Sequence, residues 1–140
     1  MSFTNHLEIG LLDHVFGGGD YVRPAVLHVG LSTTAINEDG TGITEPAAAD
    51  GYARVAVDNN TITWEDAATA TEGVHAGKGL KTNKITIEFP EATADWATVT
   101  HMFLTDGTNV LAYTALETPR TVEAGQAAKF GASSLVITLD

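Results

Sequence analysis

Residues 98–115 read Thr-Val-Thr-His-Met-Phe-Leu-Thr-Asp-Gly-Thr-Asn-Val-Leu-Ala-Tyr-Thr-Ala. The first eight residues, 98–105, carry large apolar side chains on both faces, which is typical of a central strand. Asp106-Gly107 then begins a tight connection into a second strand at 110–115. The stretch therefore predicts an antiparallel hairpin in the middle of a β-sheet.

Further strand-like segments flank this hairpin on both sides. Residues 84–89 alternate strictly, which places Ile85, Ile87 and Phe89 on one face of a strand. Short strands are also expected at residues 25–31, 52–57, 61–64, 127–130 and 135–139. The segments 34–51 and 65–83 are expected to be loops, the second with one helical turn.

Short strands separated by turns indicate a mainly β fold. We predict an antiparallel β-sandwich or barrel of about 7–8 short strands, preceded by one short N-terminal α-helix. The predicted core comprises Leu27, Val29, Ile85, Ile87, Phe89, Phe103, Leu111 and Ile137.

The N-terminal helix carries an apolar stripe and ends at three glycines. Asn5 is the expected N-cap, and Leu7, Leu11 and Val15 recur at i, i+4 and i+8, with Leu12 and Phe16 beside them. Gly17 to Gly19 end the helix and form a hinge. We therefore expect a single domain, 1–140, divided into a helix with its hinge at 1–19 and a β domain at 20–140.

Composition excludes several classes of function. The chain has 18 acidic and 7 basic residues, a formal net charge of −11, so its surface repels nucleic acid. It has no cysteine, which excludes disulfides and thiolate metal sites. It also lacks an apolar run long enough for a transmembrane helix and a recognisable signal peptide, so we expect no membrane association and assembly in a bacterial cytoplasm.

No pattern in the chain is typical of a catalytic or metal site. The five histidines form no His-Glu-x-x-His or His-x-His motif, and no serine lies in a Gly-x-Ser-x-Gly elbow. We therefore expect no enzymatic activity, no catalytic or metal-binding residues and no cofactor. Trp64 and Trp96 are interpreted as core or interface anchors, with sugar stacking as the alternative.

Several segments together resemble a known family. They are Met1–Glu8, Leu11–Gly19, Pro24–Thr34, Gly51–Val55, Ile87–Pro90, Asp95-Trp96 and Val99–His101. Across nearly its whole length the chain resembles small bacteriophage virion proteins that are often labelled tail fibre proteins. The resemblance implies a structural protein of the virion, with other virion proteins as partners.

The sequence gives less information about where in the particle the protein lies than about its class. It has no heptads and no collagen-like or β-helix repeat from which a long shaft is built, so we expect a capsid decoration (cement) protein that binds the major capsid protein. A tail fibre or tail-tip component in contact with the host is the alternative, and a carbohydrate-binding module is the second. We also expect a homo-oligomer, with a trimer as one form.

Two segments are predicted to make the assembly contacts. One is the helix, because its stripe is apolar and a helix of about three turns is not stable alone. The other is the loop at 34–51, because compact domains rarely contain loops this long without a function. The expected partner-binding residues are Leu7, Leu11, Val15, Phe16, Asn37, Glu38 and Asp39.

Overall fold

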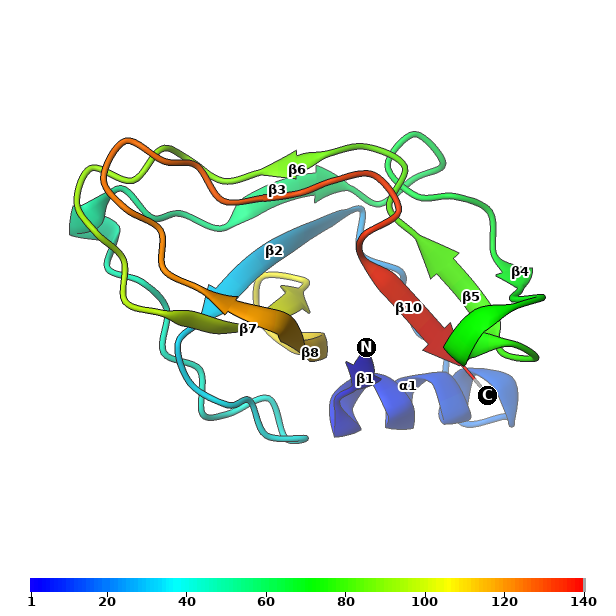
Figure 1. The fold of residues 1–140 in the computed structure, drawn as a ribbon. Coiled ribbons are helices and arrows are strands. Elements are labelled where there is room, and N and C mark those ends of the chain that lie inside the picture. Colours follow the sequence, from blue (N-terminus) through cyan, green and yellow to red (C-terminus); the bar gives the residue numbers. More distant parts are fainter. Residues whose placement is uncertain (140) are drawn as a thin grey trace.

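A computed structural model describes residues 1–139 and confirms a mainly β fold with antiparallel sheets and one N-terminal α-helix. The elements are β1 (Ser2–Phe3), α1 (Asn5–Val15), β2 (Val26–Ser32), the 3-10 turn η1 (Ala48–Asp50), β3 (Val55–Asp58), β4 (Ala68–Thr69), the 3-10 turn η2 (Gly73–His75), β5 (Gly79–Thr82), β6 (Ile87–Glu88), β7 (Val99–Thr105), β8 (Val110–Arg120), β9 (Lys129–Phe130) and β10 (Val136–Leu139). Figure 1 shows their arrangement, with α1 at one end of the molecule.

The strands form three sheets. The largest has the order β1-β8-β7-β2-β3, a second has the order β10-β5-β4, and β6 pairs with β9. The β7–β8 hairpin lies at the centre of the first sheet, as the sequence predicts. Its turn is held by Asp106, whose Oδ1 accepts the N–H groups of Thr108 and Asn109 at 2.8 and 2.6 Å.

The core lies between the inner face of the five-stranded sheet and the segments that carry the smaller sheets. Six of the predicted core residues are buried: Leu27, Val29, Ile87, Phe89, Phe103 and Leu111. Ile137 is only partly buried against the core. Trp64 and Trp96 are also core residues, each 2% exposed, which agrees with their interpretation as anchors.

The prediction for Ile85 is wrong, because this side chain is 40% exposed. The strand β6 begins only at Ile87. Before it, the buried Asn83 amide donates to Ile85 O at 2.8 Å and to Gly131 O at 2.7 Å, which holds the chain in a bend. The alternating pattern therefore extends further along the sequence than the strand does.

Two other local predictions need correction. Residues 61–63 form a turn and not a strand, since Asn60 Oδ1 accepts the N–H groups of Ile62 and Thr63, and Trp64 makes only an isolated antiparallel bridge to Asn83. The segment 65–83 contains its expected helical turn, η2, but also β4 and β5, which pair with each other while β5 pairs with β10. Small side chains and glycines concealed these strands in the sequence.

The helix begins at Asn5, but Asn5 is not its cap. Thr4 occupies the N-cap position without a side-chain capping bond, because its Oγ1 donates to Val110 O at 2.6 Å and so ties the helix to the sheet. The predicted end of the helix is confirmed. Gly17 adopts a φ of 87°, and Gly18 N–H donates to Asp13 O at 2.7 Å in a Schellman-type closure.

The long loop after β2 returns to the sheet. Phe103 lies on the face opposite the main core, over Gly30, with the Arg54 guanidinium 5.1 Å from its ring centre. Near this ring, Tyr52 OH accepts Leu31 N–H at 2.9 Å and donates to Glu45 Oε1 at 2.6 Å. These contacts fix the loop and explain why Phe103 is fully buried.

Candidate functional site: the outer face of α1

The helix α1 presents apolar side chains in two opposite directions. Leu7 packs against the core cluster, and the ring of Tyr21 lies so close to Gly10 that an added Cβ there would be 2.8 Å from it. At 100° per residue, Ile9, Leu12 and Phe16 point the opposite way. Burying one apolar face of α1 against the domain therefore leaves a second apolar face uncovered.

This second face, which we call the α1 outer face, consists of Ile9, Leu12 and Phe16. Their side chains are 60%, 58% and 79% exposed, respectively. They follow i, i+3, i+7 spacing, which aligns side chains on one side of a helix. Within α1 itself no residue is fully buried, so most of its apolar surface meets solvent in the isolated chain.

The predicted partner-binding residues of the helix fall on both sides of it. Leu7 packs against the core cluster of its own domain, and Leu11 is half-buried. Val15 is 65% exposed at the border of the outer face, and Phe16 belongs to that face. Ile9 was not among the predicted residues, although its spacing to Leu12 and Phe16 places it on the same side of the helix.

The structure brings the predicted loop residues next to the start of this helix. Asn37, Glu38 and Asp39 are exposed at a loop tip. Asn5 N–H donates to Glu38 O at 2.8 Å, and the loop is closed by Asn37 N–H to Thr41 O at 2.9 Å. The two segments that the sequence analysis singled out therefore adjoin at the N-terminal end of α1.

That surface is negatively charged at the N-terminal end of α1. Burial first, and then the nearby charges of Glu38 and Glu8, raise the pKa of Tyr113. Hydrogen bonds from the Thr41 side chain and N–H lower the pKa of Asp39, so this carboxylate stays ionised. An apolar face bordered by carboxylates is suited to a partner with apolar and basic side chains.

The remaining polar groups that the sequence analysis considered have structural roles or no shared partner. Among residues 1–139, no three His, Asp or Glu side chains converge as metal ligands would. His14 Nδ1 lies 3.5 Å from Asp20 Oδ1 and accepts Tyr21 N–H, which braces the end of the helix. Both tryptophans are buried, so neither indole offers a ring face to a sugar. None of the helices in residues 1–139 has the length and apolar character to cross a bilayer.

The chain matches a known protein family over nearly its whole length. The family model described as "Podophage GP4 fiber I protein gp80" matches residues 2–138, nearly the whole chain. No curated protein matches the chain.

Proposed function

Because the chain belongs to the podophage GP4 fiber I protein family, and is thus a structural protein of the phage virion, we propose that it is part of the fibre apparatus of the tail. In this proposal the α1 outer face and the neighbouring loop tip attach it to another virion protein. It has no catalytic role. The observation that carries the proposal is the exposure of Ile9, Leu12 and Phe16 on the solvent side of a short helix.

The physical argument concerns the stability of exposed apolar surface. Scattered apolar side chains on a protein surface are ordinary, whereas contiguous ones mark contact sites. A helix that is apolar on more than one side is normally buried on all of them. A stable contact covers about 800 Å² on each partner, more than three side chains provide, so residues 37–39 are needed to complete it.

Capsid decoration is the second candidate. It is favoured by the compact β domain, because residues 1–139 contain no extended shaft. It is also favoured by the net charge of −11, which keeps a protein soluble at the high copy number of a shell component.

The number of copies per particle separates the two candidates. Quantitative mass spectrometry of purified virions, calibrated on the major capsid protein, is expected to give a few copies to a few tens. Immunogold labelling is expected to mark the tail. Hundreds of copies and labelling of the whole shell would refute the tail proposal and favour decoration.

A further inference from the structure

We infer that the space between β8 and the segment 126–136 accepts an extended, acidic segment of another virion protein, which pairs with the edge of β8 that β1 leaves free. The inference rests on the chain being a virion protein. The inference does not depend on where the protein lies in the particle or on contacts made by α1.

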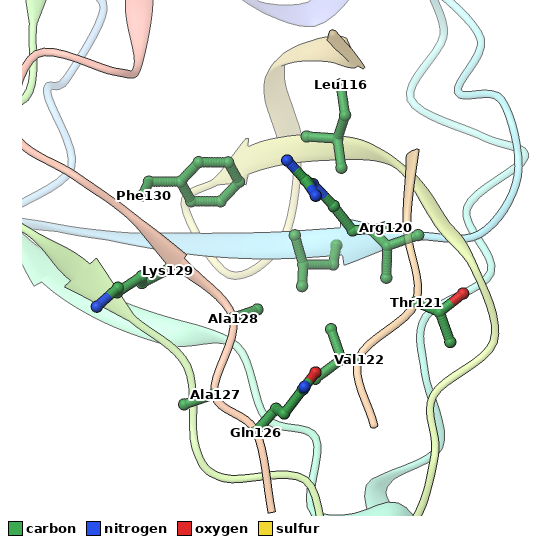
Figure 2. A pocket seen from close by; sticks show the side chains of 11 residues that line it. Leu116, Arg120, Thr121, Val122, Gln126, Ala127, Ala128, Lys129 and Phe130 are labelled. Carbon is green, nitrogen blue, oxygen red and sulfur yellow. The ribbon is translucent and has the colours of Figure 1, made fainter. Parts of the chain in front are cut away.

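The space is a groove that opens into the core. Two cavities, of about 640 and 260 Å³, share the lining residues Leu116, Arg120, Lys129 and Phe130 and so form one continuous groove, which we call the β8 groove. Figure 2 shows Leu116, Arg120 and Phe130 gathered in its narrower part. Buried apolar residues, among them Met102 and Val99, also line it, so core side chains border the open space.

One wall of the groove is a strand edge without a partner. The strand β1 pairs only with Ala112 and Tyr113, although β8 continues to Arg120. Leu111 O accepts Thr4 N–H on the β1 side, so the period of two turns the backbone groups of Ala115 to that side as well. After Ala115 the next residue of β8 that pairs with β7 is Arg120, so residues 116–119 form a bulge that pairs with neither strand. No strand in residues 1–139 pairs with Ala115 on the β1 side. Such an edge can template a further strand.

At the end next to Met1 the groove is one strand wide. At one end of the groove, Ser2 pairs with Tyr113 of β8, while the Met1 amino group donates to Val136 O of β10 at 3.0 Å. Figure 1 shows the N-terminus between these two strands. Met1 lines the groove, which therefore continues the line of β1 where β1 ends.

The charges of the groove indicate the chemistry of its occupant. Arg120 and Lys129 both line it, and neither forms an ion pair with any residue the structure describes. Besides these two cations, the wider part of the groove is lined by the carboxylate of Glu117 and by His75. Two unpaired cations in a chain of net charge −11 favour a segment that alternates apolar side chains with Asp or Glu.

A second copy of the chain is a poor fit. Each strand of residues 1–139 is already paired on at least one side, so an edge strand of another copy could reach only one wall of the groove. A segment that is unpaired before binding, such as a flexible arm, can reach both walls. We therefore assign the groove to a different protein of the particle.

Hydrogen exchange of the β8 edge tests this inference. In the isolated protein at low concentration, the amide of Ala115 should exchange rapidly, and in intact virions at least a hundredfold more slowly. Equal exchange in both samples would mean that the groove is empty in the particle and would overturn the inference. Protection that appears in the isolated protein as its concentration rises would identify a second copy as the occupant and overturn it too.

Charge reversal provides an independent test. The double variant Arg120→Glu/Lys129→Glu should still fold, because both side chains are exposed, with a small decrease in melting temperature because the new carboxylate at position 129 would face Glu88 across the β6–β9 pair. Its copy number in virions should fall at least tenfold, while Arg120→Lys/Lys129→Arg should be incorporated normally. Arg23→Glu is the control for charge reversal at an exposed site outside the groove. Normal incorporation of the double variant contradicts the inference, even if the tail location is confirmed.

Discussion

Tyr52 joins three parts of the molecule through one hydroxyl group. It accepts Leu31 N–H from β2, donates to Glu45 in the long loop and packs edge-on against Trp96 in the core. Replacing it with Phe keeps the ring but leaves the buried Leu31 N–H without its acceptor. We expect Tyr52→Phe to lower the free energy of unfolding by about 1–3 kcal/mol in urea denaturation. A loss below the error of the measurement would mean that the loop is not held by this bond.

The pH dependence of stability depends partly on Glu45. Burial acts to raise the pKa of this carboxyl, but the bonds from Arg54 and Tyr52 outweigh it and hold the pKa below its ordinary value of 4.5. A carboxyl with a lowered pKa stabilises the fold above 4.5, and that contribution is lost as the pH falls through the folded-state pKa. Glu45→Gln should therefore show a smaller drop in melting temperature between pH 6 and pH 3 than the wild type. Parallel curves for the two proteins would contradict this assignment.

Phe89 is the aromatic centre of the core. It is 2% exposed and lies 6.0 Å from the ring of Tyr52 and 6.3 Å from that of Phe130. Truncation to Ala leaves a cavity that these rings cannot fill, so Phe89→Ala should destabilise the protein by about 3–5 kcal/mol. Ile85→Ala is the matched control, because this neighbouring side chain is exposed and should change stability little. Calorimetry of both variants compares the two sites directly.

At the scale of the elements, the two faces of α1 should respond differently to the same substitution. Leu12→Glu places a charge on the outer face, so we expect an unchanged melting temperature and at least a tenfold loss of incorporation into virions. Leu7→Glu places the same charge against the core and should lower the melting temperature markedly. Normal incorporation of a folded Leu12→Glu variant would show that α1 is not an attachment surface.

The sequence predicted the elements whose patterns are local. The β7–β8 hairpin and the end of α1 follow from runs of apolar residues and from the left-handed glycine at 17. Ile85 was misplaced because its exposure depends on Asn83, whose amide bonds to Gly131, 48 residues away in the chain. The direction of the α1 outer face likewise depended on where the sheet lies, since apolar residues occur on both sides of the helix. Features that depend on contacts between distant segments therefore could not be predicted from local sequence patterns.

For the whole molecule, net charge and exposed apolar surface act against each other. At neutral pH the charge of −11 opposes further association of copies through the exposed α1 outer face. Acidification removes this repulsion as carboxylates are protonated, so the isolated protein should begin to associate between about pH 5 and pH 4. Dynamic light scattering should show larger particles in this range for the wild type and a weaker effect for Leu12→Glu. Equal scattering from the two proteins would show that association does not involve the α1 outer face.

Pro119, near the end of β8, also affects how readily the protein aggregates before assembly. An open strand edge is a hazard in a crowded cell, where growing chains can stack onto it and form amyloid-like aggregates. Proline has no N–H to offer a neighbouring chain, and Glu117 and Arg120 beside it add charges that a misaligned strand must desolvate. These three residues thus limit the part of the β8 edge on which another chain can pair to a few residues. Replacing Pro119 with Val would restore a backbone N–H at this position. We expect the variant to form more inclusion bodies in the cell than the wild type.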